Sequence, residues 1–86
     1  MRIDYHPKFK KQFKKLSPRV QARFQNRLEI LLLNPTSPEL RVHALRAKYN
    51  GYFSMDVTGD VRALFYYEGS TVVVFGFIGT HSQLYG

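Results

Sequence analysis

The hydrophobic positions of this chain recur with two different periods, and the change falls near Gly51. In the first half, apolar residues recur three or four positions apart: Phe9, Phe13, Leu16, Val20, Phe24, Leu28 and Leu31. In the second half, aromatic and β-branched residues alternate or run in short blocks. Since a helix repeats every 3.6 residues and a strand every two, the pattern predicts helices first and strands afterwards.

Proline positions predict where the helices begin and end. Pro7 and Pro18 each stand at the start of a helical pattern, where a missing N–H costs nothing, and Ser17 is a suitable cap before Pro18. Pro35 disfavours a helical residue before it, so the second helix is expected to stop by Asn34. Ahead of both helices, the alternation over 2–5 predicts a short strand.

The second half predicts three strands, over residues 52–57, 61–67 and 71–78. The segments 58–60 and 68–70 contain Gly with Asp or Ser and read as turns. Strands joined by such short turns form an antiparallel meander. By contrast, residues 35–50 carry no clear period, and we expect a mostly extended loop that enters a strand near Leu45.

The length of the first turn decides which side chains share a face. A three-residue turn over 58–60 places Val57 opposite Val61 and Asp56 opposite Arg62 on the other face. A two-residue turn would set the Arg62 guanidinium against Val57, which is costly unless the charge is paired. The longer turn is therefore favoured. The expected fold is α+β: an N-terminal strand and an α-helical hairpin packed on a small antiparallel β-sheet, in one domain over residues 1–86.

Charge is distributed unevenly along the 86 residues, whose formal net charge is +7. Residues 1–48 hold twelve Lys or Arg and three acidic residues, a net +9, whereas residues 49–86 carry a net −2. A basic half suits a phosphate backbone or an acidic protein, since neutralised phosphates release counterions. A solvated basic helix face is the simpler alternative.

Several classes of protein are disfavoured by composition. The chain contains no Cys, which removes disulfides and Cys-based metal or nucleophilic sites. Lysines rather than an apolar segment follow the first residues, so no signal peptide is predicted. The longest apolar runs fall far short of the roughly 20 residues needed to span a bilayer. We expect a cytoplasmic protein without membrane contact.

The clearest candidate for chemistry is His81, which follows the last predicted strand. With an ordinary pKa of about 6.5, an imidazole can act as acid or base near neutral pH. On spacing alone, a structural role for His81 is the commoner outcome.

Several motifs together carry a resemblance that covers the whole chain. They are Gly51-Tyr52, Gly59-Asp60-Val61-Arg62, Tyr66 and the closing Gly79-Thr80-His81-Ser82-Gln83-Leu84-Tyr85. With the order of elements, they resemble the RelE/ParE superfamily of bacterial toxins, and the ending resembles its YafQ-like branch. The resemblance implies a ribosome-dependent mRNA endoribonuclease, held inactive by a cognate antitoxin protein and using no cofactor or metal.

The resemblance also implies site residues. His81 matches the branch's principal catalytic His and Tyr85 its terminal aromatic residue, while His43 and Asp60 match two further active-site positions. Asp56 stands where the branch has another His. Arg62 matches instead the Arg that stabilises the transition state in RelE-like and YoeB-like members. Arg46 and Lys48 are the counterparts of a lysine pair in RelE itself. Together with Lys10, Lys11, Lys14 and Lys15, which the excess of positive charge indicates, they are expected to bind mRNA or ribosomal RNA.

The chemistry would be attack of a ribose 2′-hydroxyl on the adjacent phosphorus. Arg62 can stabilise the added negative charge, and His81 can protonate the leaving 5′-oxygen. The base remains open among Asp56, Asp60 and His43. Each has a structural alternative: an ion pair with Arg62, a turn residue and an exposed loop residue, respectively. Tyr85 can stack on a base or pack the tail.

Two other functions use the same fold. A ParE-like protein would inhibit DNA gyrase as an interaction module without catalysis, and the His-containing ending argues against it. A non-catalytic RNA-binding member is the third possibility.

Overall fold

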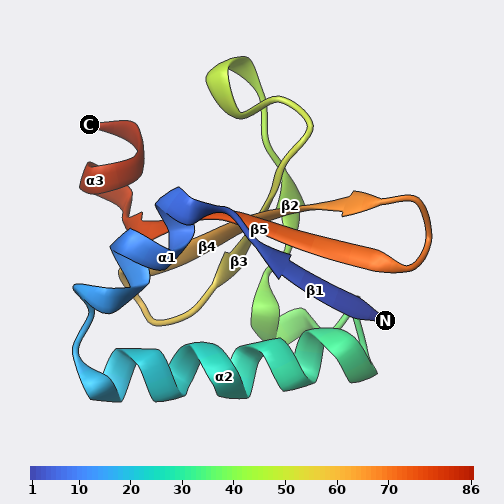
Figure 1. Ribbon diagram of the computed structural model, residues 1–86, viewed down its shortest axis with the longest axis horizontal. Helices are drawn as coiled ribbons and strands as arrows, with labels where there is room; N and C mark the ends of the chain where they lie inside the picture. Colours follow the sequence, from blue (N-terminus) through green and yellow to red (C-terminus); the bar gives the residue numbers. More distant parts are fainter.

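A single five-stranded sheet organises the protein, in a computed structural model that describes residues 1–86 (Figure 1). The strands are β1 (Arg2–Tyr5), β2 (His43–Ala44), β3 (Phe53–Asp56), β4 (Val61–Glu68) and β5 (Val72–Thr80). Their order across the sheet is β1-β5-β4-β3-β2. β1 runs parallel to β5, and every other pair is antiparallel. The predicted α+β fold is confirmed.

Both predicted helices are present, as α1 (Pro7–Lys14) and α2 (Pro18–Leu33). Each begins with a proline in its first turn, and the Ser17 hydroxyl accepts a hydrogen bond from the Val20 N–H at 3.3 Å. Asn34 leaves helical geometry with φ −149°, as expected of a residue before Pro35. None of the helices has the length and apolarity needed to span a membrane.

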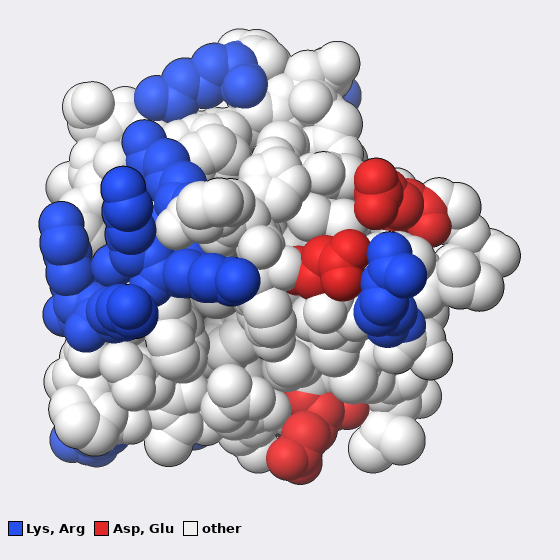
Figure 2. Space-filling view, viewed as in Figure 1, with Lys and Arg blue, Asp and Glu red and all other residues white.

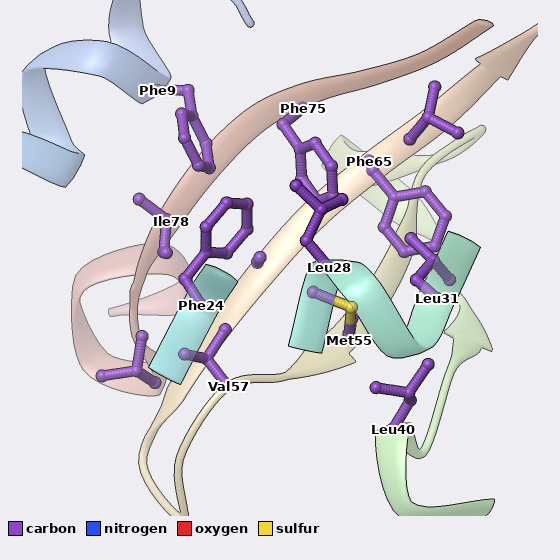
Figure 3. Close-up of a cluster of buried hydrophobic side chains, with 13 residues drawn as sticks. Phe9, Phe24, Leu28, Leu31, Leu40, Met55, Val57, Phe65, Phe75 and Ile78 are labelled. Carbon is purple, nitrogen blue, oxygen red and sulfur yellow. The ribbon is translucent and has the colours of Figure 1, made fainter. Parts of the chain in front are cut away.

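One face of the sheet packs on the helices and forms the core (Figure 3). The register pairs Phe53 with Phe65 and Met55 with Ala63, so a three-residue turn joins β3 to β4 as predicted. Phe24, Leu28 and Leu31 of α2 pack among these strand residues, and Phe9 joins them from α1. The first half of the chain thus buries the apolar side of the second half.

Residues 35–50 differ from the mostly extended loop that the sequence predicted. They form two 3₁₀ turns, η1 (Pro38–Leu40) and η2 (Ala47–Tyr49), on either side of the short strand β2. Arg41 and Ala47 have positive φ values of 51° and 55°, which reverse the chain at each end of β2. Burial of Leu40 and Tyr49 holds these turns on the sheet, because each inserts an apolar side chain into a cluster. The local sequence has no period that reveals this.

The last strand is interrupted by a bulge at Gly76. Leu64 pairs with Phe77 and Phe65 pairs with Phe75, which leaves Gly76 without an opposite residue. A Cβ at position 76 would lie 2.7 Å from the Tyr52 hydroxyl oxygen. Glycine is required because the Tyr52 ring lies directly against this backbone.

A short helix, α3 (His81–Tyr85), closes the chain. The Thr80 hydroxyl accepts from the Gln83 N–H at 3.2 Å, and the Gln83 side chain accepts from the Thr80 N–H at 2.8 Å. This reciprocal capping fixes where the helix begins. Leu84 is buried beside Leu64, which attaches α3 to the sheet face opposite α2.

Candidate functional site

An ion pair on the exposed sheet face forms the centre of the candidate site. Arg62 of β4 and Asp56 of β3 lie opposite each other, and Arg62 Nε contacts Asp56 Oδ1 at 2.9 Å. The second carboxylate oxygen, Oδ2, lies 3.6 Å from Arg41 Nε. The side chains of Asp56 and Arg62 are 17 % and 24 % exposed, so water screens their pair only in part. One carboxylate thus holds two guanidinium groups.

The guanidinium of Arg62 is anchored at two of its three nitrogens. Besides the Nε contact, Nη1 donates to the carbonyl oxygens of Thr58, Gly59 and Val61 at 3.0, 3.3 and 3.3 Å. Nη2 makes no hydrogen bond within the protein. An arginine fixed in this way presents a free, oriented N–H edge, the geometry suited to a phosphate oxygen.

His81 and Tyr85 lie one helical turn apart on α3, and their ring centroids are 4.8 Å apart. Tyr49 packs edge-on against Tyr85 at 5.3 Å, and its hydroxyl donates to the Leu84 carbonyl at 2.6 Å. These contacts tie α3 to η2. The imidazole itself remains exposed.

The end of β5 brings α3 close to Arg62. Arg62 lies opposite Gly79 in the β4–β5 ladder, and Gly79 precedes His81 by two residues. Burial and the neighbouring Tyr49 raise the pKa of Tyr85 above its ordinary value, while the positive charge of Arg62 acts in the opposite direction. The phenol of Tyr85 therefore feels the Arg62 charge and remains protonated near neutral pH.

The other predicted catalytic residues are placed differently. His43 lies on the edge strand β2, opposite Ser54, and its Nδ1 is 3.1 Å from the Arg41 carbonyl oxygen. Asp60 is exposed in the β3–β4 turn, where its backbone N–H bonds to Thr58 and its carboxylate makes no ion pair or hydrogen bond. The structure therefore brings Asp56 and Arg62 together, and His81 and Tyr85 together, but leaves Asp60 apart.

The lysines of α1 border two different hollows. Lys8, Lys11 and Lys15 line a polar hollow with Gln12, whose side chain accepts from the Ile78 N–H at 2.9 Å. Lys10 and Lys14 border an apolar hollow of about 270 Å³ between α1 and α2. Figure 2 shows basic side chains gathered on the side of the molecule where α1 lies. The four predicted lysines thus divide between the two hollows.

The remaining predicted RNA-binding residues lie at η2. Arg46 caps this turn, and the Lys48 ammonium is 5.1 Å from the centre of the Tyr49 ring. No three His, Cys, Asp or Glu side chains gather closely enough to hold a metal ion.

Sequence reasoning missed Arg41 and Tyr49. Arg41 continues the β2–β3 register, which would set it opposite Asp56, but a two-residue strand has no readable period. Tyr49 stood in the same unreadable segment. An aromatic residue between turn residues was the only signal for it.

The fold belongs to a known class of bacterial toxins. A crystal structure of YafQ from E. coli strain BL21(DE3) matches with a TM-score of 0.84 and 23 % identity, over 100 % of both chains. YafQ in the E. coli DinJ–YafQ toxin-antitoxin complex gives 0.80 and 22 %, over 98 % of this chain and 96 % of that one. The YoeB/ParE toxin from Agrobacterium tumefaciens gives 0.79 and 14 %, over 94 % and 99 %. These likenesses establish the RelE-like toxin fold.

The family follows from the sequence profile described as "Bacterial toxin of type II toxin-antitoxin system, YafQ", which matches residues 1–86. This chain belongs to that family of toxins. A search of curated protein sequences finds no significant match.

Proposed function

We propose that this toxin is a ribosome-dependent mRNA endoribonuclease. The observation that carries the proposal is the anchored Arg62, whose free Nη2 lies in the part of the sheet where α3 presents His81 and Tyr85. A fixed cation, whose partner residue in the ladder stands two positions before an exposed imidazole, supports acid–base chemistry on a phosphodiester. Membership of the YafQ family supports the same activity.

In the proposed reaction, the ribose 2′-oxygen attacks the adjacent phosphorus, and the bond to the 5′-oxygen breaks. Arg62 Nη2 stabilises the charge that develops on the phosphoryl oxygens, and His81 donates a proton to the leaving 5′-oxygen. The products are a cyclic phosphate and a free 5′-hydroxyl. Tyr85 holds the His81 ring through a tilted ring contact, with the centroids 4.8 Å apart.

We assign the base to His43 rather than to Asp56 or Asp60. The Arg41 carbonyl can only accept, so Nδ1 of His43 carries the hydrogen in that bond and Nε2 keeps a free lone pair. Both oxygens of Asp56 already face guanidinium nitrogens. Asp56 is then the residue that orients Arg62, and Asp60 belongs to the turn.

The test is single-turnover cleavage of mRNA on purified ribosomes by His81→Ala. The rate is expected to fall about 10²- to 10⁴-fold, the usual contribution of general acid catalysis, with ribosome affinity nearly unchanged. Ser82→Ala changes the neighbouring exposed residue of α3 and is the control. A rate within a few-fold of the wild type would refute the role of His81.

The same preparation distinguishes the gyrase-directed alternative. Wild-type protein is expected to leave supercoiling by DNA gyrase unchanged while it cleaves mRNA on ribosomes. Inhibition of gyrase together with intact mRNA would assign the chain to a ParE-like function. RNA binding without either effect would indicate a non-catalytic member.

A cognate antitoxin is the proposed protein partner. DinJ binds the similar YafQ, and YefM binds the similar YoeB from Staphylococcus aureus. On this chain, the net charge of +7 and the lysine-bordered apolar hollow between α1 and α2 suit an acidic segment with apolar anchors. Co-purification with the product of the adjacent small reading frame checks this, and free toxin after co-expression contradicts it.

The lysines of α1 are the proposed contact with ribosomal RNA. Lys11 and Lys15 border the polar hollow, and Lys10 and Lys14 add to the same basic side of the molecule. Arg46 and Lys48 extend the positive surface to η2. Ribosome binding should therefore weaken as salt rises, which co-sedimentation measures.

A further inference from the structure

Aromatic rings form an unbroken chain of contacts across the sheet face opposite α2. In order along the chain of contacts, the rings are His6, Tyr66, Tyr52, Phe77, Tyr49, Tyr85 and His81. Neighbouring centroids are between 4.8 and 5.8 Å apart. We name these seven residues the aromatic strip. It begins at the candidate active site and ends at the junction of β1 and α1.

Most rings of the strip are accessible to solvent, so burial in a core does not account for the whole strip. Only Tyr49 is buried with the apolar residues Leu64 and Leu84, and the other rings remain at least partly accessible. Tyr66 and His6 lie outside this small apolar cluster, so the packing of α3 and η2 does not account for them. Accessible rings in a row on a strand face are a typical platform for unstacked bases.

Cationic groups border the half of the strip that leads to α3. The Lys8 ammonium lies 6.0 Å from the centre of the Phe77 ring, and the Lys48 ammonium lies 5.1 Å from that of Tyr49. Arg62 stands where the strip reaches α3. Cations for phosphates therefore border the rings Phe77, Tyr49 and Tyr85, and this combination fits single-stranded nucleic acid better than an apolar partner.

The end of the strip far from His81 opens into a third hollow, of about 480 Å³. His6 Nε2 and the Tyr66 hydroxyl face each other there at 3.0 Å, and Lys10, Asp4 and Glu68 line the wall. Both carboxylate oxygens of Asp4 accept from Arg2 at 3.2 Å, which leaves Glu68 as the carboxylate without a partner. A ring, a cation and hydrogen-bond acceptors in one hollow match the face, phosphate and amino edge of a nucleotide.

We propose that the aromatic strip is a stacking track for single-stranded RNA and that the hollow at His6 and Tyr66 holds one base. This inference rests on the proposed function, because the RNA would enter the active site at one end of the track. Tyr66 lies opposite Val74, and His81 follows Thr80. At roughly 3.3 Å per strand residue, the two ends are about 20 Å apart, so the footprint extends several nucleotides beyond the cleaved bond.

The test measures binding of fluorescent oligocytidylates by anisotropy, in a His81→Ala background that prevents cleavage and removes the same ring of the strip from every protein compared. Cytosine is chosen because its amino group can donate to the Glu68 carboxylate of the hollow. A seven-nucleotide oligomer is expected to bind at least tenfold more tightly than a three-nucleotide one. Tyr66→Leu should weaken the longer oligomer about tenfold and leave the shorter one unchanged, with no change in the salt dependence of binding.

Tyr67→Leu is the matched control, because Tyr67 is the next residue of β4 and packs against Phe53 and Phe65 on the opposite face. It should bind both oligomers as the background does. His6→Leu is a second probe of the hollow, since the His6 side chain does not cap α1 and its loss leaves the helix start intact. It should also weaken only the longer oligomer.

Equal affinity of the two oligomers, or full affinity in folded Tyr66→Leu and His6→Leu variants, would overturn the track. The ribosome assay keeps this separate from the proposed function. If His81→Ala abolishes cleavage while ring variants bind normally, the track is wrong and the nuclease stands. If ring variants lose affinity while His81→Ala still cleaves, the track stands and the catalytic assignment fails.

Discussion

At the scale of single residues, the decisive feature is that Arg62 is held by its neighbours before any substrate arrives. Asp56 and three backbone carbonyls fix two nitrogens, so the third is oriented without further loss of side-chain entropy. A lysine side chain has a single charged nitrogen. That one nitrogen cannot both donate to the anchoring oxygens and contact a phosphate.

We therefore predict that Arg62→Lys slows single-turnover cleavage nearly as much as Arg62→Ala. In the double variant with His81→Ala, the loss should be smaller than the product of the two single losses, because both groups act on one transition state. Cleavage rates on ribosomes of the wild type, Arg62→Lys, Arg62→Ala, His81→Ala and the double variant measure this. Near wild-type activity of Arg62→Lys would show that a positive charge alone suffices.

At the scale of secondary-structure elements, the bulge in β5 sets the geometry of the site. The extra residue at Gly76 shifts the ladder, so that Phe77 and Gly79 face the same side as Leu64 and Arg62. Without this shift, the side chains after Gly76 would point to the opposite faces of the sheet. The bulge and the Tyr52 ring against it thus deliver α3 to the correct face.

Gly76→Ala is expected to destabilise the protein by about 1–3 kcal/mol, as overpacked sites do, because the new Cβ would lie 2.7 Å from the Tyr52 hydroxyl oxygen. Thermal or urea unfolding measures the change. Gly59→Ala is the control, since a Cβ there meets nothing within 4 Å. In the double variant with Tyr52→Ala, the loss of stability should be smaller than the sum of the two single losses, because the clash is then absent. Equal stability of Gly76→Ala and Gly59→Ala would contradict this account.

At the scale of the whole molecule, three phenols that folding partly removes from water link stability to pH. Burial raises the pKa of Tyr5, Tyr52 and Tyr85 above the ordinary value of 10.0. The unfolded chain therefore releases these protons at lower pH than the folded protein does. The stability they contribute is complete below about pH 10 and is lost as pH rises through the higher folded pKa values.

We predict that the free energy of unfolding falls as pH is raised above about 10, and that Tyr52→Phe makes this fall less steep. Urea titrations across this range measure the slope for the variant and the wild type. The measurement is made relative to each protein's own stability at neutral pH, which removes any effect of the substitution on packing. An identical slope in Tyr52→Phe would contradict the linkage at this residue.

The sequence by itself determined the α+β class, both helices and the β3–β4 register. Its local signals were strong because Pro7, Ser17 and Pro18 act on neighbouring backbone, and because alternation over a strand shows directly which face is apolar. The pairing of Asp56 with Arg62 followed from that register and is confirmed at 2.9 Å.

Only the tertiary structure decided the rest of the site. Arg41 reaches Asp56, and Tyr49 holds α3, through a segment whose shape depends on burying Leu40 and Tyr49. The aromatic strip likewise joins His6 to His81, residues at opposite ends of the chain. Such contacts leave no trace in local periodicity, because they are set by which strands become neighbours in the sheet and by which residues fill the gaps between them.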